Sequence, residues 1–194
     1  MDRIRDRLSA RRPERIGEDR VARAAVAMVL HAARDDARLL LIQRAHRDGD
    51  PWSGHMALPG GRKDPDDVDL IHTAIRETQE EVGIDLGADA DVIGELDQLR
   101  AVARFRPLDL VISPFVFRLR RSVSLTLSAR EVRSSVWVPL SFFRTPEAVG
   151  RYRRELEGIA TEFPCYRYQG YTIWGLTHRI LDGFLRIVAS SEEE

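Results

Sequence analysis

The stretch Leu58–Ile84, LPGGRKDPDDVDLIHTAIRETQEEVGI, combines a glycine-bearing turn with a sequence of helical periodicity. Apolar residues recur through its second half at the spacing of one helix face, which predicts a helix over residues 68–82. Glu77, Glu80 and Glu81 fall at i, i+3 and i+4, so they project from a single face. Three like charges repel one another there, and a divalent cation with oxygen ligands would remove that repulsion. The pattern therefore indicates either a solvated acidic face or a metal site.

This stretch resembles the Nudix box, G-x5-E-x7-R-E-U-x-E-E-x-G-U, in which U is a bulky aliphatic residue. Residues 76–84 match its second half at every position except Thr78, which stands where an aliphatic residue is usual. The first half is one residue longer than the pattern, and Asp66 or Asp67 stands where the first glutamate is expected. The same expansion is a feature of the coenzyme A pyrophosphatase branch of the family.

Other segments are similar to that branch. Residues 40–61 place two leucines, an arginine, a small residue, a glycine and Pro-Gly-Gly in its order. The loop there is one residue longer, Arg47 falls out of register, and Leu58 replaces the usual phenylalanine. The sequences ISPFV at 112–116 and IWGLT at 173–177 also resemble the branch. The longer loop, the displaced Arg47 and the replacement at Leu58 bear on which substrate is expected more than on membership of the family.

The resemblance implies an α/β (α+β) fold, a Nudix-type α/β/α sandwich with a mixed sheet between helices. It also implies Mg²⁺, or Mn²⁺, as the cofactor. The metal ligands carried over from the family are Glu77, Glu80, Glu81 and the backbone carbonyl of Gly60, since the paired glycines let backbone approach a ligand closely. Arg76 matches the arginine that holds a box glutamate in place by a charge-assisted bond.

The catalytic set that we predict from the box consists of Arg76, Glu80 and Glu81. Glu131, in the loop expected before the Trp-Val-Pro-Leu sequence at 137–140, is the candidate general base outside the box, and a solvated glutamate is the alternative. Asp67 has two open readings, an outer-shell metal ligand or the N-cap of the box helix.

Cations near the glycine turn are the candidate phosphate-binding residues, although arginines near a turn are also common on surfaces. This set comprises Arg44, Arg47, Arg62 and Lys63. Trp52, Phe105 and Trp137 could stack on a base, with roles in the core as the alternative. Neither His55 nor His72 has a visible partner in the sequence, so we interpret both as ordinary packing residues.

The function implied is metal-dependent hydrolysis of the diphosphate in a nucleoside diphosphate derivative, with coenzyme A or acyl-CoA as the expected substrate. A Nudix hydrolase of ADP-ribose, NADH, a nucleotide sugar or a nucleoside triphosphate is one alternative. A regulatory Nudix protein that binds a nucleotide without cleaving it is another. Such proteins usually lose box glutamates, and this chain retains three, which favours catalysis.

Composition limits the remaining classes. The chain has 194 residues and a net charge of −1, which does not indicate a broad nucleic-acid-binding surface. Cys165 is the only cysteine, so no disulfide can form within the chain, which fits a reducing compartment. We interpret Cys165 as a semi-buried structural thiol, with a nucleophile as the alternative. The sequence lacks a membrane-length apolar run and a signal peptide. We therefore expect a cytoplasmic protein with a small-molecule substrate, no membrane partner and, by resemblance, a homodimer.

The expected organisation is a charged extension (1–20) with a short solvated or dimer-contacting helix, one domain (21–190) and an acidic tail (191–194). Strands are predicted at 21–31 and 38–44, paired as a hairpin, and at 91–99, 108–119, 122–127 and 136–140. A basic loop is predicted at 100–107, a helix at 141–156, irregular chain at 157–170, and a closing helix from 171–177 to 188.

Overall fold

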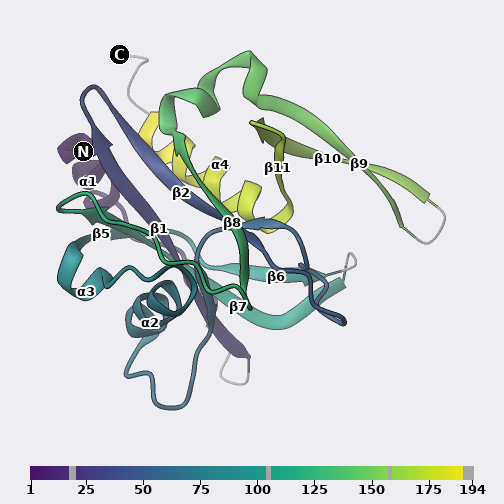
Figure 1. The fold of residues 1–194 in the computed structure, drawn as a ribbon, viewed down its shortest axis with the longest axis horizontal. Helices are drawn as coiled ribbons and strands as arrows, with labels where there is room; N and C mark the ends of the chain where they lie inside the picture. Colours follow the sequence, from purple (N-terminus) through teal and green to yellow (C-terminus); the bar gives the residue numbers. More distant parts are fainter. Residues whose placement is uncertain (18–20, 104–105, 157–158, 190–194) are drawn as a thin grey trace.

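The computed structural model describes residues 1–17, 21–103, 106–156 and 159–189 (Figure 1). Its helices are α1 (Asp2–Ser9), α2 (Leu70–Val82), α3 (Leu86–Asp89) and α4 (Gly175–Ala189), with 3-10 helices η1 (Leu140–Arg144) and η2 (Pro146–Ala148). Its strands are β1 (Ala22–Ala33), β2 (Asp36–Arg44), β3 (Met56–Ala57), β4 (Gly60–Arg62), β5 (Ala90–Glu95), β6 (Leu99–Ala103), β7 (Arg106–Leu119), β8 (Val132–Pro139), β9 (Val149–Leu156), β10 (Ile159–Tyr168) and β11 (Tyr171–Trp174).

Strand β1 is the centre of a mixed sheet that contains eight strands within the described residues. It pairs in parallel with β7 along one edge. Along its other edge it pairs antiparallel with β4 and then with β2, which confirms the predicted hairpin. Strands β3 and β8 extend the sheet from β2, while β5 and β6 pair with β7. The glycine turn thus becomes part of the sheet, because β4 lies against β1.

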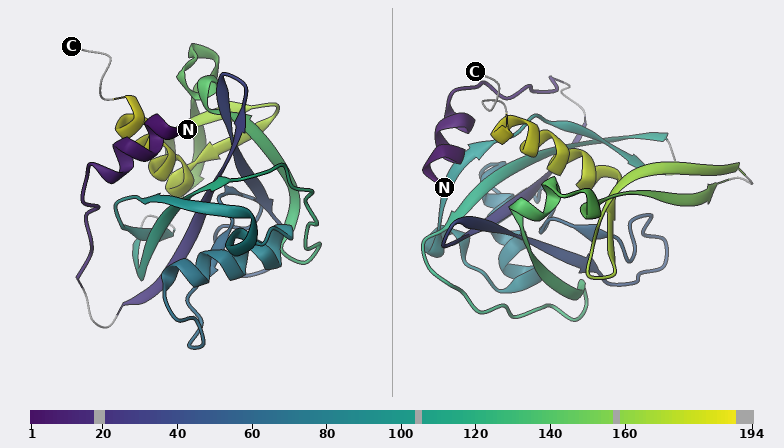
Figure 2. Two further views of the ribbon diagram at one scale, coloured as in Figure 1. Left: turned by 90° about the vertical axis from the view of Figure 1, so that its left-hand side faces the viewer. Right: turned by 90° about the horizontal axis from the view of Figure 1, so that it is seen from above.

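Alternate residues of the central strands serve two separate cores. In β1, Ala27 and Val29 pack with α2, whereas Met28 and Leu30 pack with α4. Both faces of the sheet are apolar, so each requires a covering layer. Figure 2 shows α2 on one side of the sheet and α4 with α1 on the other. The predicted α/β/α sandwich is confirmed.

The interface between α2 and the sheet is built from small side chains. Ala25, Ala27 and Ala74 are fully buried there, which lets the helix approach the strand closely. Thr78, the residue that departs from the Nudix pattern, is also fully buried. Its hydroxyl donates to the carbonyl oxygen of Ala74 at 2.7 Å, so no polar group is left unpaired by the departure.

The N-terminal helix packs on the domain, which corrects the expectation of a solvated helix. Leu8 of α1 is buried against β5, where a side chain at Gly94 would collide with it. The guanidinium of Arg7 donates to the carbonyl of Val188 at the end of α4. The backbone N–H of Glu14 donates to the Asp97 carboxylate at 2.7 Å. Residues 1–17 are therefore held by contacts to the sheet and to α4.

The region after β8 contradicts the predicted helix at 141–156 and the irregular chain at 157–170. It forms η1, η2 and a three-stranded antiparallel sheet in the order β11-β10-β9. Strands β9 and β10 project from the body of the molecule as an arm (Figures 1 and 2). These segments form strands because their backbone N–H and C=O groups hydrogen-bond to a neighbouring strand. The apolar spacing within one segment does not show that such a neighbour exists.

Two further predictions were wrong. The basic loop at 100–107 is largely a β6–β7 hairpin, and the two described strands pair antiparallel. The segment 122–127 forms no strand in the described structure. Its alternating apolar residues pack against the α2 core, and the N–H of Thr126 donates to the carbonyl of Val82 at 2.9 Å. This segment therefore satisfies the C-terminal end of α2 instead of joining a sheet.

Candidate active site

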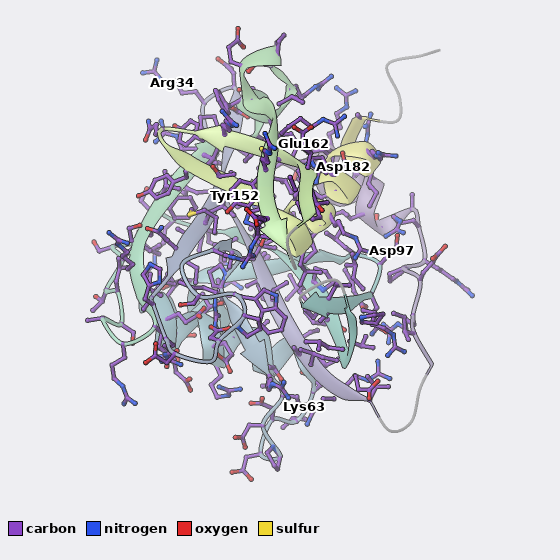
Figure 3. The ribbon with its side chains drawn as sticks, turned by 90° about the vertical axis from the view of Figure 1, so that its right-hand side faces the viewer. Arg34, Lys63, Asp97, Tyr152, Glu162 and Asp182 are labelled. Atoms are coloured by element: carbon purple, nitrogen blue, oxygen red, sulfur yellow. The ribbon has the colours of Figure 1, made fainter. Side chains whose placement is uncertain are left out.

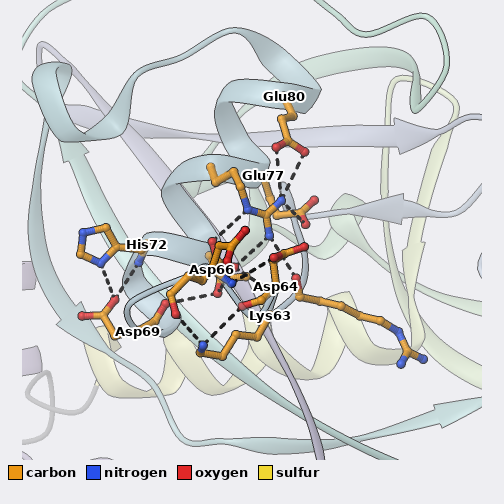
Figure 4. Close-up of polar contacts among 11 residues, drawn as sticks. Lys63, Asp64, Asp66, Asp69, His72, Glu77 and Glu80 are labelled. Atoms are coloured by element: carbon orange, nitrogen blue, oxygen red, sulfur yellow. Dashed lines mark hydrogen bonds and ion pairs between the residues drawn. The ribbon is translucent and has the colours of Figure 1, made fainter.

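Helix α2 begins at Leu70, two residues later than predicted. Its N-cap is Asp69, whose carboxylate accepts from the backbone N–H of His72 at 2.8 Å (Figure 4). Its C-cap is Gly83 in the left-handed conformation. Asp67 is therefore not the N-cap, and the side chain of His72 also bonds to Asp69.

Arg76 connects Asp67 to the box glutamates. Its Nε and Nη2 bond both oxygens of the buried Asp67 carboxylate, each at 3.0 Å, and Thr73 donates to the same carboxylate at 2.9 Å. The bonds from Arg76 hold the pKa of Asp67 well below its usual range. Because these partners use both oxygens, Asp67 serves as the anchor of Arg76, and the reading of an outer-shell metal ligand is not supported.

The remaining guanidinium nitrogen of Arg76 holds two glutamates. Its Nη1 lies 2.8 Å from Glu77 Oε1 and 3.3 Å from both carboxylate oxygens of Glu80. The predicted contact between Arg76 and a box glutamate is thus present in the structure. Figure 4 shows this chain of contacts running from the loop before α2 to Glu77 and Glu80.

The paired glycines are required by close packing around the same carboxylates. A side chain at Gly61 would collide with the carboxylate of Glu77. Gly60 adopts a φ of 149°, and a side chain there would collide with the backbone of β1. The N–H of Gly60 donates to Glu81 Oε2 at 2.9 Å. The turn therefore fixes both Glu77 and Glu81 from the side opposite the helix.

Glu81 is the most buried of the three box glutamates, with 2% of its surface exposed. Burial, together with the negative charges of Glu77 and Glu131, raises the pKa of Glu81 to about 8. Burial also raises the pKa of Glu77. The charged forms of these carboxylates are therefore disfavoured in the metal-free site, and a bound cation would stabilise them.

A cavity of about 830 Å³ opens over these glutamates. Most of the predicted site residues line it. They are Gly60, Glu77, Glu80 and Glu81 from the box region, Glu131 from the loop before β8, and Arg44, Arg47 and Arg62 from the predicted cation set. The structure therefore brings the two predicted groups, carboxylates and arginines, to one space.

Two of those arginines are engaged with acidic partners. Arg47 lies 3.0 Å from Glu131 Oε1 and also donates to the carbonyl of Arg130. Arg44 lies 2.7 Å from Asp50, and its buried Nε has no hydrogen-bond partner in the described structure. A buried donor left over at a cavity wall is costly, which favours an anionic ligand there.

The other predicted residues lie elsewhere or play different roles. The described lining of the cavity does not include Lys63, whose amine donates to the backbone carbonyl of Asp67 at 2.5 Å. Trp137 packs on the α2 side of the sheet. Trp52 does line the cavity, and Phe105 lies outside the described residues. His55 also lines the cavity, and burial lowers its pKa to about 4, so its imidazole is neutral at physiological pH.

Residues 21–156 match the NUDIX domain family. The chain belongs to the Nudix family. Three relatives illustrate this similarity. A mitochondrial coenzyme A diphosphatase of Mus musculus is 31% identical over 174 residues, covering 88% of this chain and 80% of that protein. A peroxisomal coenzyme A diphosphatase of Caenorhabditis elegans is 37% identical over 62% of this chain and 50% of its own length. An uncharacterized protein of Schizosaccharomyces pombe is 47% identical over 58% of this chain, but only 35% of that protein is covered.

Solved structures support the same fold. A MutT/nudix family protein from Enterococcus faecalis has a TM-score of 0.57 at 19% identity, covering 93% of this chain and 67% of that one. A binary complex of a C. elegans Ap4A hydrolase has a TM-score of 0.52 at 24% identity, covering 62% of this chain and 82% of that one. With the family match and these relatives, the expected enzyme class, a Nudix pyrophosphohydrolase, is confirmed. Within the described residues no helix is long and apolar enough to cross a membrane.

The donor set of this Nudix site fits a divalent cation chemically. Nudix hydrolases generally require such a cation, and Glu77, Glu80, Glu81 and the Gly60 carbonyl offer the hard oxygen ligands that Mg²⁺ or Mn²⁺ prefers. In the described ranges no three acidic, imidazole or thiol groups already converge on one point that could hold a metal ion. Arg76 restrains Glu77 and Glu80, while the turn restrains Glu81.

The lining of the Nudix cavity includes functional candidates that were not predicted. They are Arg154 on β9, Phe163 on β10, Trp174 at the end of β11 and Arg179 on the first turns of α4. A signal was present only for Trp174, which lies in the IWGLT sequence quoted for its resemblance to one branch of the family. Arg154 and Phe163 were hidden because their segment was predicted to be helical or irregular.

Proposed function

We propose that the protein is a divalent-metal-dependent hydrolase that cleaves the diphosphate bond of coenzyme A or acyl-CoA. The products would be 3′,5′-ADP and 4′-phosphopantetheine or its acyl form. The observation that carries this proposal is one cavity that contains the box carboxylates, several arginines and an apolar wall. Relatives of this chain in mouse and nematode are named coenzyme A diphosphatases.

The cavity lining matches the chemical parts of such a substrate. Five arginines line it, enough to face a diphosphate and a further phosphate ester. Leu110, Ile112 and Leu176 form an apolar stretch of the wall, which suits a pantetheine arm. A volume of about 830 Å³ lies in the upper part of the range common for ligand pockets. These features favour a long, multiply charged substrate over a simple nucleotide.

The residues of this chain would divide the chemistry among themselves. A bound divalent cation would neutralise the diphosphate oxygens and polarise the attacking water. Arg76, fixed by Asp67, orients Glu77 and Glu80, and the glycine turn orients Glu81. Glu131, held by Arg47 at the cavity wall, is the proposed acceptor of the proton from water. Arg44 would bind a phosphate oxygen with its spare donor.

The test is hydrolysis of a substrate panel by the full chain, with and without Mg²⁺. The panel contains coenzyme A, acetyl-CoA, NADH, ADP-ribose, a UDP-sugar and a dNTP. We expect metal-dependent release of 3′,5′-ADP from the coenzyme A compounds, and loss of most turnover in Glu81→Gln. Preferred cleavage of another compound would reject coenzyme A as the substrate. Tight binding without cleavage of any compound would favour the regulatory alternative.

The choice of proton acceptor has its own variant. Glu131→Gln should lower kcat by about 10²-fold or more while leaving KM within a small factor, because proton transfer contributes to the transition state more than to binding. An unchanged kcat would indicate that the general base is a box residue instead.

Among the relatives named above, one is mitochondrial and one is peroxisomal. The cytoplasmic location and the homodimer remain predictions for this protein.

A further inference from the structure

The far wall of the cavity carries a cluster of aromatic rings that the proposed chemistry does not use. Trp174 is its centre and ends β11 directly before Gly175, whose φ of 64° starts α4. The indole lies 4.7 Å from the ring of Tyr152, 4.8 Å from that of His55 and 5.4 Å from that of Phe163, measured between centroids. The guanidinium carbon of Arg154 lies over the indole at 5.4 Å.

Strand register explains why these side chains share one face. Phe163 and Tyr152 are cross-strand partners in the β9–β10 pair. Arg154 is two residues from Tyr152, so it points to the same side of β9. Figure 3 labels Tyr152 in the upper part of the molecule and Lys63, beside the glycine turn, at the bottom. In this view Tyr152, the labelled member of the cluster, is well separated from Lys63.

The cluster does not resemble core packing. Trp174, Phe163, Tyr152 and His55 are all partly exposed. None of the four belongs to the three hydrophobic clusters found among the described residues. Trp174, Phe163 and His55 line the cavity directly. Large aromatic surfaces left at the wall of a cavity are available for a planar ligand.

Two cations that line the same cavity have no acidic partner among the described residues. Arg154 and Arg179 both line the cavity, and neither forms an ion pair with a carboxylate in the described parts of the chain. They differ in this respect from Arg44 and Arg47, which are engaged near the box. Two guanidinium groups without a carboxylate partner in the described structure, beside a cluster of tilted aromatic rings, are suited to an aromatic ligand that carries its own phosphate.

We propose that this wall binds the 3′-phosphoadenosine part of the substrate, with the adenine on the Trp174 cluster and the 3′-phosphate between Arg154 and Arg179. The inference rests on the proposed function, because it assigns parts of coenzyme A to the two ends of one cavity. The box end acts on the diphosphate, and the β9–β10–β11 end selects the nucleotide. Aromatic stacking tolerates any base, whereas the paired guanidinium groups distinguish a 3′-phosphate from a free hydroxyl.

A binding experiment tests this assignment without turnover. Calorimetry in EDTA compares 3′,5′-ADP with 5′-AMP on the full chain, so neither hydrolysis nor a metal is required. We expect 3′,5′-ADP to bind about tenfold or more tightly than 5′-AMP, since charge-assisted bonds to the extra phosphate are lost in 5′-AMP. Arg154→Gln and Arg179→Gln should each reduce that preference. Trp174→Leu should weaken both ligands together.

Arg153→Gln is the matched control. It removes the same charge from the same strand, but Arg153 points to the opposite, exposed side of β9. It should leave the preference unchanged. Thermal unfolding of each variant identifies any that fail to fold, and Trp174→Phe then replaces Trp174→Leu, with a smaller loss expected.

Several results would overturn the assignment. They are equal affinity of the wild-type protein for both ligands, no measurable binding of 3′,5′-ADP, or the same loss of preference in Arg153→Gln as in Arg154→Gln. Kinetics separate this failure from failure of the proposed function. A protein that cleaves coenzyme A and dephospho-coenzyme A with equal kcat/KM would keep its proposed reaction and lose only the assigned wall.

Discussion

Replacing Glu81 with Gln should change how stability depends on pH in the metal-free protein. The carboxylate is buried, and burial raises its pKa to about 8. In the unfolded chain its pKa lies near 4.3. Between these values the folded state holds a proton that the unfolded state has released. Folding therefore loses stability as the pH rises from about 4 to about 8, because the unfolded chain is favoured by releasing that proton.

The size of the effect follows from the two pKa values. The shift lowers the free energy of unfolding by about 1 kcal/mol at pH 5 and about 3.5 kcal/mol at pH 7. Urea unfolding in EDTA at both pH values should show the wild-type protein losing about 2.5 kcal/mol more than Glu81→Gln on going from pH 5 to pH 7. Comparing differences between pH values cancels other titrating groups and any packing cost of the amide.

Metal adds the second arm of this experiment. If Glu81 is a ligand, saturating Mg²⁺ at pH 7 should stabilise the wild-type protein by about 2.7 kcal/mol at a concentration of 100 Kd, and Glu81→Gln much less. Glu80→Gln is a control for the pH effect, because the Glu80 side chain is 52% exposed and remains hydrated. Identical pH dependence in the wild-type protein and Glu81→Gln would refute the argument from burial, and equal stabilisation by Mg²⁺ would refute the ligand assignment.

Three further predictions follow from the same geometry. Asp67→Asn should destabilise the protein by about 2 kcal/mol in urea unfolding, which is less than a fully buried pair would lose because Arg76 is partly exposed. The same variant should lower kcat because Arg76 loses its anchor. A kcat equal to that of the wild-type protein would contradict the positioning role. Gly61→Ala should reduce turnover by more than tenfold, since its methyl group collides with Glu77. The control is Gly17→Ala, whose methyl group meets no neighbour and whose backbone, like that of Gly61, does not have a positive φ. His55→Gln should reduce the loss of folding stability that the protein suffers in acid, because burial lowers the pKa of His55 to about 4. As the pH falls below about 6.5, the unfolded chain binds a proton at His55 that the folded state does not bind, which favours unfolding. If urea unfolding curves at pH 5 were the same for the variant and the wild-type protein, this argument would be refuted.

The box could be predicted from sequence because its contacts are local. Glu77, Glu80 and Glu81 share a face by helical spacing alone, and Arg76 reaches two of them within the same helix. The hairpin of β1 and β2 was equally accessible, because each strand carries a short apolar run and the turn between them is polar. Asp67 was misread because its partner, Arg76, is nine residues away and the competing caps at Asp67 and Asp69 look alike in sequence.

The second sheet could not be predicted in the same way. Strand β9 carries apolar and charged residues that also satisfy helical spacing, and only its pairing with β10 and β11 decides the outcome. The prediction for the segment 122–127 was wrong in the opposite way, because a strand was expected and none formed in the described structure. Its alternation suggests a strand, yet the N–H of Thr126 donates to the carbonyl of Val82 at the C-terminal end of α2. Both errors arise where the partner of the backbone lies far away in the chain.

This contrast has a consequence for how the enzyme would acquire specificity. The groups proposed for chemistry lie within one local stretch and are bonded to one another, so most changes among them would disturb several contacts at once. The Trp174 wall is supplied by strands outside that stretch, and within the described residues Arg154 forms no hydrogen bond or ion pair with the box. Substitutions on β9 and β10 can therefore change which nucleotide is accepted while leaving Arg76 and its glutamates in place. A Nudix box can accordingly persist unchanged among enzymes with different substrates, and the substrate of this protein has to be sought on the wall.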